Sequence, residues 1–287
     1  MCDDDINPWL PADPAVSRRA FGLGAAAAAA LTAAEARAQA QVVEKDVTVK
    51  TPDGTAEAVL LHPAGKGTWP AVLIWTDIGG LRPVFRQMGR RLAAQGYVVL
   101  VPNPFYRSAD QAQTQALSFA TPSGRQTLMA YRAAIAAGAG PAGDAQAFLA
   151  FLDAQAQTNT KRPAGVQGYC MGGPLAFQTA GALPARIGAV ASFHGAGLTT
   201  DGPASPHLLI PKTRASYFVA IAKNDDARDP KSKDILKAAF AEAKRPATVE
   251  VYQGDHGWCV PGSQVYDQAE AERAWAELTK LYKAALG

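Results

Sequence analysis

The residues with the clearest chemical potential are a cysteine and the glycines around it, in the segment Gly168-Tyr169-Cys170-Met171-Gly172-Gly173. The segment follows a short apolar run and fits the pattern Gly-x-nucleophile-x-Gly of a sharp strand-to-helix turn. Glycines two residues on either side of Cys170 permit a close backbone approach. A helix beginning at Met171 directs its N-terminal N–H groups toward the thiol, which favours the thiolate. The alternative is a buried cysteine after an ordinary turn, because free cysteines are among the most buried residues.

A nucleophilic cysteine needs a base within hydrogen-bonding reach and a group that orients the base. On this kind of turn the chain order is nucleophile, acid, histidine, and the last two follow later strands. Asp225 and its neighbour Asp226 follow one apolar strand-like segment, and His256 follows the next, between two glycines. We therefore predict a triad of Cys170, His256 and Asp225, with Asp226 as the alternative orienting acid.

The other three histidines of the chain have weaker claims to the role of base. His62 ends an early hairpin and is expected to be a solvated edge residue. His207 lies in a proline-rich loop that no strand end holds. His194 ends a strand on the predicted catalytic edge, so it is a candidate substrate contact, and a packing or capping role is the alternative.

The predicted reaction is attack of the thiolate on an ester or lactone carbonyl, which needs two backbone donors for the resulting oxyanion. The N–H of Met171, directly after the nucleophile, is the first predicted donor. The second is expected in the loop after the apolar segment 71–75, at Ile78.

The elements that must position these residues alternate between strand-like and helix-like segments, which predicts a mostly parallel sheet flanked by helices. The expected strands are 42–50, 55–62, 71–75, 97–101, 165–169, 187–194, 216–222 and 248–253. The expected helices are 83–95, 127–136, 144–157, 171–181, 230–244 and 265–285, with a loop at 138–141. The long segment 195–214 is expected to be a functional lid or poorly ordered.

Taken together, the motif around Cys170, its spacing to Asp225 and the segment Gly254-Asp255-His256-Gly257-Trp258 resemble the dienelactone hydrolase family. The segment 95–103 is similar to another core segment of that family, and the resemblance runs from about Lys45 to Leu286. It implies an α/β-hydrolase fold, with a mostly parallel central sheet and helices on both faces. It also implies a Cys-His-Asp triad, with no metal and no cofactor.

The resemblance also suggests roles for residues around the triad. Asp77 stands where members of the family carry a glutamate that holds the resting thiol neutral. Val260 stands where they carry an arginine that binds the substrate carboxylate, which argues against the dienelactone itself as substrate. Trp258 and Trp75 are candidates to line an acyl pocket. The candidates for a substitute anion contact are Arg82, Arg86 and Arg107.

The predicted function is hydrolysis of small esters or lactones through a cysteinyl acyl-enzyme. The alternative is a non-catalytic protein that binds small molecules on the same fold. A redox role for Cys170 and Cys259 is a third possibility, but a bridge between them would disable the proposed nucleophile. We therefore predict that both are free thiols.

The N-terminus resembles an export signal of the twin-arginine type. Ser17-Arg18-Arg19-Ala20-Phe21-Gly22-Leu23 precedes an alanine-rich stretch, and A-x-A cleavage patterns end at Ala38 and Ala40. An amphipathic anchor helix is the alternative, which the scarcity of large apolar residues disfavours. We predict a signal at residues 1–40, export of the folded protein to the periplasm or beyond, and one α/β-hydrolase domain at 41–287.

The composition of this chain of 287 residues argues against several classes of binding partner. A hydrophobic content of 48% with 18% charged residues is typical of a globular protein with a sizeable core. The net charge is +3 without a Lys/Arg cluster, which argues against nucleic acid as a partner. No segment after the signal approaches the roughly 18 apolar residues of a membrane span, so no stable membrane association is expected. The pattern leaves the oligomeric state open.

Overall fold

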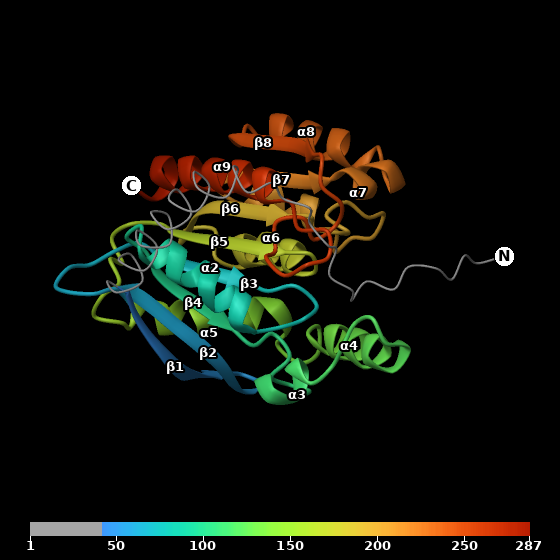
Figure 1. Cartoon of the computed structure of the whole chain (residues 1–287). Coiled ribbons are helices and arrows are strands. Elements are labelled where there is room, and N and C mark those ends of the chain that lie inside the picture. Colours follow the sequence, from blue (N-terminus) through green and yellow to red (C-terminus); the bar gives the residue numbers. More distant parts are fainter. Residues whose placement is uncertain (1–41) are drawn as a thin grey trace, which may run out of the picture. The chain divides into compact units, whose positions relative to one another are not determined.

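The computed structural model describes residues 42–287, and the predicted export signal at residues 1–40 lies outside them. An eight-stranded sheet runs through the described part of the chain (Figure 1). Its strands are β1 (Val42–Thr51), β2 (Gly54–Pro63), β3 (Ala71–Trp75), β4 (Val98–Pro102), β5 (Ala164–Tyr169), β6 (Ile187–Phe193), β7 (Ser216–Ala222) and β8 (Ala247–Tyr252). Each predicted strand is therefore present, with its bounds within one residue of the expectation.

The sheet has the order β1-β2-β4-β3-β5-β6-β7-β8. It is mostly parallel, and this part of the arrangement was predicted. β1 and β2 form an antiparallel hairpin in which Val42 lies opposite Pro63, and β2 is antiparallel to β4. All other neighbouring strands are parallel. The carboxyl ends of the parallel strands thus meet at one edge, where the loops of an open α/β sheet form ligand sites.

Helices lie on both faces of the sheet. Helices α2 (Pro83–Ala93) and α9 (Gln268–Leu286) pack on one face, and α5 (Gly140–Asp153), α6 (Gly172–Ala182) and α8 (Ser232–Glu242) pack on the other. Helix α2 shows why: Phe85, Met88 and Leu92 recur at helical spacing and are all buried. Pro83 lies in the first turn of α2, where a backbone N–H has no carbonyl partner within the helix, so the N–H that proline lacks is not missed there.

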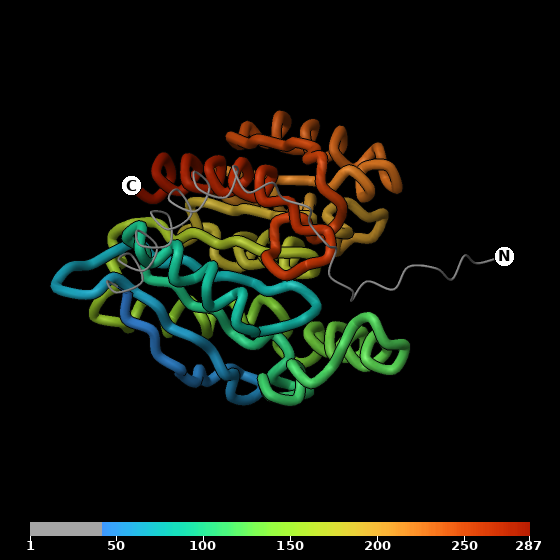
Figure 2. The backbone as a smooth tube through the Cα atoms, in the orientation of Figure 1, coloured from blue at the N-terminus to red at the C-terminus, as the bar shows by residue number. Residues whose placement is uncertain are grey.

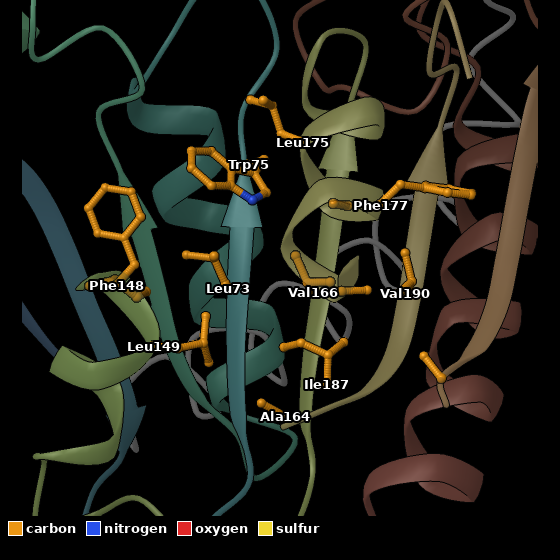
Figure 3. Packing of buried hydrophobic residues seen from close by; sticks show 14 of the residues in the cluster. Leu73, Trp75, Phe148, Leu149, Ala164, Val166, Leu175, Phe177, Ile187 and Val190 are labelled. Atoms are coloured by element: carbon orange, nitrogen blue, oxygen red, sulfur yellow. The ribbon is translucent and has the colours of Figure 1, made fainter. Parts of the chain in front are cut away.

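The core is divided between the two faces because successive strand residues point to opposite sides. On β3, Leu73 and Trp75 join the cluster under α5 and α6, whereas Val72 and Ile74 join the cluster under α2 and α9. Figure 3 shows the first of these clusters, in which Leu73 and Trp75 lie beside Phe148 of α5. All five residues of β3 are buried, which is why the strand has a continuous apolar sequence.

Several helices differ from the sequence-based expectation. Helix α4 (Pro122–Ala134) begins before the predicted 127 because the Thr121 hydroxyl accepts a hydrogen bond from the Gly124 N–H at 3.2 Å. Helix α5 begins at Gly140, so the second half of the expected loop 138–141 is helical. Three short helices have no predicted counterpart: α3 (Gln111–Gln115), η1 (Pro206–Lys212) and α7 (Lys223–Arg228).

Two long excursions follow strands at the carboxyl edge. The excursion between β4 and β5 carries α3, α4 and α5, and Figure 2 shows its green part, around α4, standing out from the sheet. The segment 195–214 contains η1, and Thr199 shares a hydrogen bond of 2.7 Å with Ser232 at the start of α8. Among residues 42–287, no helix is both long enough and apolar enough to cross a membrane.

Candidate active site

The turn after β5 has the geometry that the sequence predicts for a nucleophile. Cys170 has φ = 53°, a left-handed conformation that non-glycine residues rarely adopt, and its N–H donates to the Phe193 carbonyl at 3.0 Å. A Cβ on Gly168 would overlap the carbonyl oxygen of Gly172, and one on Gly172 would lie 2.6 Å from the Trp75 carbonyl oxygen. Both glycines are therefore required for the turn, and Cys170 is partly exposed at its tip.

His256 lies in the loop after β8, where its ring is oriented by an acid from the neighbouring strand. Its Nδ1 and Oδ2 of Asp225 are 2.6 Å apart. The backbone N–H of His256 also donates to Oδ1 of Asn224 at 2.9 Å. Asp225 was expected in a loop, but it lies in the first turn of α7. Asp226 is directed elsewhere, because Nζ of Lys233 donates to its Oδ1 at 2.7 Å.

The charges around His256 favour its protonated form. Burial of the ring opposes the positive charge, but hydrogen bonds to Asp225 and Cys170 outweigh it and raise the pKa of His256 from 6.5 to about 10. Cys170 and His256 line the same cavity, and the Cys170 side chain is one cause of this raised pKa. An imidazolium at this position stabilises a thiolate beside it.

Both predicted oxyanion donors border the same cavity. Met171 and Ile78 line it together with Cys170 and His256. Within residues 42–287, neither the Met171 N–H nor the Ile78 N–H donates to a protein group. Two free backbone donors beside a nucleophile have the chemistry of an oxyanion hole.

The cavity has a volume of about 440 Å³ and is mostly apolar. Ala196 and Val260 line it together with Cys170 and His256, and Phe119 and Met129 line it from the α4 excursion. The remaining lining residues are Asp77, Arg82, Arg132, His194, Gly257 and Ser263. Phe119, Met129 and Arg132 were not predicted as site residues, because no sequence motif places the α4 excursion at the cavity of Cys170.

Asp77 borders the cavity but is held by groups other than the thiol. Nη2 of Arg82 donates to Oδ2 of Asp77 at 2.8 Å, and a second guanidinium nitrogen donates to Oδ1. The Gly79 N–H also donates to Oδ1 of Asp77 at 2.8 Å. In the described chain no hydrogen bond joins Asp77 to Cys170, so the thiol-gating role stays a prediction.

Three of the residues predicted to contact substrate, His194, Trp258 and Arg107, lie in different places. His194 lines the cavity. Trp258 is fully buried behind His194, with ring centroids 5.4 Å apart, and is not part of the lining. Arg107 lies away from the cavity, where its guanidinium pairs with Asp53 and Asp144. The sequence could not reveal this, because Arg107 precedes its partner Asp144 by 37 residues.

Cys170 and Cys259 are both free thiols in the structure, and Cys259 is buried. Burial raises the pKa of the Cys259 thiol well above its usual value, so it is an inert side chain. Across the described ranges, no group of three or more His, Cys, Asp or Glu side chains is arranged to hold a metal ion.

Residues 56–286 of the chain match the sequence model of the Dienelactone hydrolase family. Carboxymethylenebutenolidase of Rhodococcus opacus is 27% identical over 208 residues, which cover 71% of this chain and 75% of that protein. That of Pseudomonas putida is 28% identical over 159 residues, covering 55% of this chain and 63% of that protein.

Solved structures resemble the described domain closely. A dienelactone hydrolase-type protein of Klebsiella pneumoniae superposes with a TM-score of 0.71 at 18% identity, covering 84% of this chain and 98% of that chain. A dienelactone hydrolase-like promiscuous phosphotriesterase from metagenomic libraries superposes with a TM-score of 0.67 at 21% identity, covering 86% and 100%. The predicted α/β-hydrolase fold is therefore confirmed.

Proposed function

We propose that this chain, which belongs to the dienelactone hydrolase family and is a hydrolase of esters or lactones, works through a triad of Cys170, His256 and Asp225. One observation carries the proposal. Oδ2 of Asp225 lies 2.6 Å from Nδ1 of His256, and His256 lines one cavity with Cys170, which stands at a left-handed turn. Groups that follow three different strands thus supply a thiol, an imidazole in the same cavity and a carboxylate behind the imidazole, which is the set that nucleophilic catalysis requires.

The first half of the reaction forms the acyl-enzyme. The Cys170 thiolate attacks the carbonyl carbon, a C–S bond forms, and the oxyanion accepts hydrogen bonds from the N–H groups of Met171 and Ile78. When the tetrahedral intermediate collapses, the C–O bond to the leaving group breaks. The leaving oxygen takes the proton from Nε2 of His256, which Asp225 keeps oriented through Nδ1. Loss of one oxyanion donor would cost about 3 kcal/mol of transition-state stabilisation.

The second half regenerates the thiolate. Nε2 of His256, now neutral, takes a proton from water as the water oxygen attacks the thioester carbonyl. The C–S bond then breaks, the Cys170 thiolate leaves, and a carboxylic acid is released. The imidazolium that results is stabilised by Asp225, which restores the resting pair.

The cavity supports small, largely apolar esters or lactones as substrates. Its volume of about 440 Å³ lies at the lower end of small-molecule sites. Val260, Phe119 and Met129 supply apolar surface around the nucleophile, while no arginine lies four residues past the histidine.

A burst assay tests the mechanism with an activated ester that releases a chromophore. The wild-type protein is expected to release about one equivalent of chromophore per molecule before the steady state. Cys170→Ala and His256→Ala are each expected to lose activity by about 10³-fold or more, because triad members act as a unit. Cys259→Ala is the matched control, since its buried thiol lies outside the cavity lining. Binding of the ester without turnover in the wild type would instead favour the non-catalytic binding protein.

We further propose that residues 1–40 export the folded domain by the twin-arginine route. The proposal rests on Arg18-Arg19, the alanine-rich stretch after them and the A-x-A patterns ending at Ala38 and Ala40. Replacement of both arginines by lysine is expected to retain the protein in the cytoplasm. Unchanged recovery from the periplasmic fraction would contradict the proposal.

A further inference from the structure

His194 stands at the end of β6, directly beside the nucleophile turn. Like Cys170 it has a left-handed backbone, with φ = 40°, and its N–H donates to the Ala220 carbonyl at 2.8 Å. Its side chain lines the cavity but is only 1% exposed. Neither ring nitrogen has a hydrogen-bond partner among residues 42–287. A strained backbone and a buried imidazole without partners both reduce the stability of the fold, and such features cluster at functional sites.

Aromatic rings hold the imidazole of His194 in place. Its centroid lies 4.7 Å from that of His256, and the two rings meet edge to face at 65°. Trp258 lies 5.4 Å away at 71°, and Tyr169 lies 6.1 Å away at 55°. Trp258 is itself stacked on Tyr252, with centroids 5.1 Å apart. His194 therefore packs between the ring of His256 on one side and the buried rings of Trp258 and Tyr169 on the other.

The charges near His194 keep its ring neutral. Burial, together with the positive charge of His256, lowers the pKa of His194 to about 3, and Asp225 opposes this only in part. The ionisable groups near the pair of histidines are Cys170 and Asp225, with Arg228 3.6 Å from Asp225 on the exposed side. Asp77, Arg82 and Arg132 line the same cavity as both histidines. A neutral aromatic ring beside an imidazolium attracts it, as aromatic faces attract other cations.

We infer that His194 is a positioning residue whose neutral ring orients His256 and stabilises its imidazolium beside Cys170. The inference rests on the Cys170–His256 pair of the proposed function. No proton or bond changes at His194 during the reaction. Its hydrogen-bonding capacity is not used, so the aromatic ring, and not its nitrogen atoms, is the feature that matters.

The pH dependence of Cys170 alkylation by iodoacetamide tests this inference, with the modified peptide quantified by mass spectrometry. A thiolate–imidazolium pair gives two midpoints, one where the thiolate forms and a higher one where His256 loses its proton. His194→Leu removes the ring, so the lower midpoint should rise and the upper one should fall, each by about half to one pH unit. His194→Phe keeps a ring and should retain most of the wild-type profile.

Three further measurements separate this role from plain packing. His194→Leu is expected to lower kcat about tenfold with little change in KM, because it acts on the nucleophile and not on substrate binding. Its thermal unfolding temperature should equal or exceed that of the wild type, because an unpaired buried imidazole is replaced by an apolar side chain. His207→Leu is the matched control and should leave both midpoints unchanged, since His207 shares a hydrogen bond with Ser205 outside the cavity lining.

The possible results are distinct. Midpoints in His194→Leu equal to those of the wild type would overturn the inference, and so would equal losses in the Leu and Phe variants. If the Leu variant does not fold, His194→Asn removes the aromatic ring with a residue that tolerates the left-handed backbone, and should show the same shifts. A single ordinary thiol profile in the wild type would overturn the Cys170–His256 pair itself, and with it the proposed function.

Discussion

Arg107 lies at the centre of a partly buried ion cluster that joins exposed Asp53, in the β1–β2 hairpin, to buried Asp144 of α5. Its Nη1 donates to Oδ2 of Asp144 at 2.7 Å and its Nη2 donates to Oδ1 at 2.8 Å. Nη2 also donates to Asp53 at 2.5 Å, and the Tyr106 hydroxyl donates to Asp144 at 2.6 Å. The Asp144 side chain is 1% exposed and that of Arg107 9%. Arg107→Met should therefore leave a buried carboxylate without its cation.

The expected loss of stability follows from this burial. Removing one partner of a buried ion pair typically costs about 3–5 kcal/mol, because the remaining charge stays desolvated. The methionine keeps most of the buried stem, so lost packing adds little. Adding Asp144→Asn to Arg107→Met removes the stranded charge, and the double variant should be more stable than Arg107→Met alone. Lys280→Met breaks an exposed pair with Glu277 and should cost no more than about 1 kcal/mol.

Urea unfolding at pH 7 measures these changes through the transition midpoint, with the slope m expected to be unchanged. Ester hydrolysis measured well below the unfolding temperature tests function in the same variants. Because Arg107 lies outside the cavity lining, KM should be unaffected for neutral and carboxylate-bearing esters alike. A cost below about 1 kcal/mol would refute the buried-pair argument. A rise in KM confined to carboxylate-bearing esters would restore Arg107 as a substrate contact.

Three further predictions concern the turn, the base and the cavity. Gly168→Ala should prevent correct folding, since its Cβ would overlap the Gly172 carbonyl, whereas a Cβ on Gly202 would make only an ordinary contact with Oγ1 of Thr200 at 3.9 Å; circular dichroism and thermal melts compare the two. The pKa of His256 is raised in the folded state, so protonation of this ring stabilises the fold fully below about pH 6.5, and the stabilisation is lost as pH rises toward about 10. The difference in melting temperature between the wild type and His256→Gln should therefore shrink over that range. Phe119→Ser and Met129→Ser should each raise KM up to about tenfold for bulky apolar esters and leave acetyl esters unaffected; equal effects on both would contradict their place in the cavity.

Much of the fold followed from local patterns. The strands of the sheet are continuous or alternating apolar segments, and their bounds were predicted to within one residue. Helix starts were less accurate, because the start of α4 depends on the cap at Thr121 and not on the apolar periodicity. The short helix α7 was missed because it has no buried residue, and so the sequence shows no apolar periodicity there.

In the same way, part of the candidate site could be predicted from short segments of the sequence, and part depends on contacts between segments far apart in the chain. The glycines around Cys170 and the strand before it predict a nucleophile turn, because a tight turn restricts the residues that can form it. The sequence favoured Asp225 but left Asp226 as an alternative, since adjacent residues of a helix turn point in different directions and only the fold shows which one faces His256. In the structure, Asp226 faces Lys233 and Asp225 faces His256.

Residue types and spacing along the chain were sufficient to predict the strands and the sharp turn at Cys170, because each depends on backbone geometry over a few residues. The folded chain was needed to learn that Arg107 neutralises Asp144, that Phe119 and Met129 border the cavity, and that His194 packs on His256. Those relations depend on side-chain directions and on packing between segments far apart in the chain. Such contacts form only when the core brings the segments together, and they have no local signature.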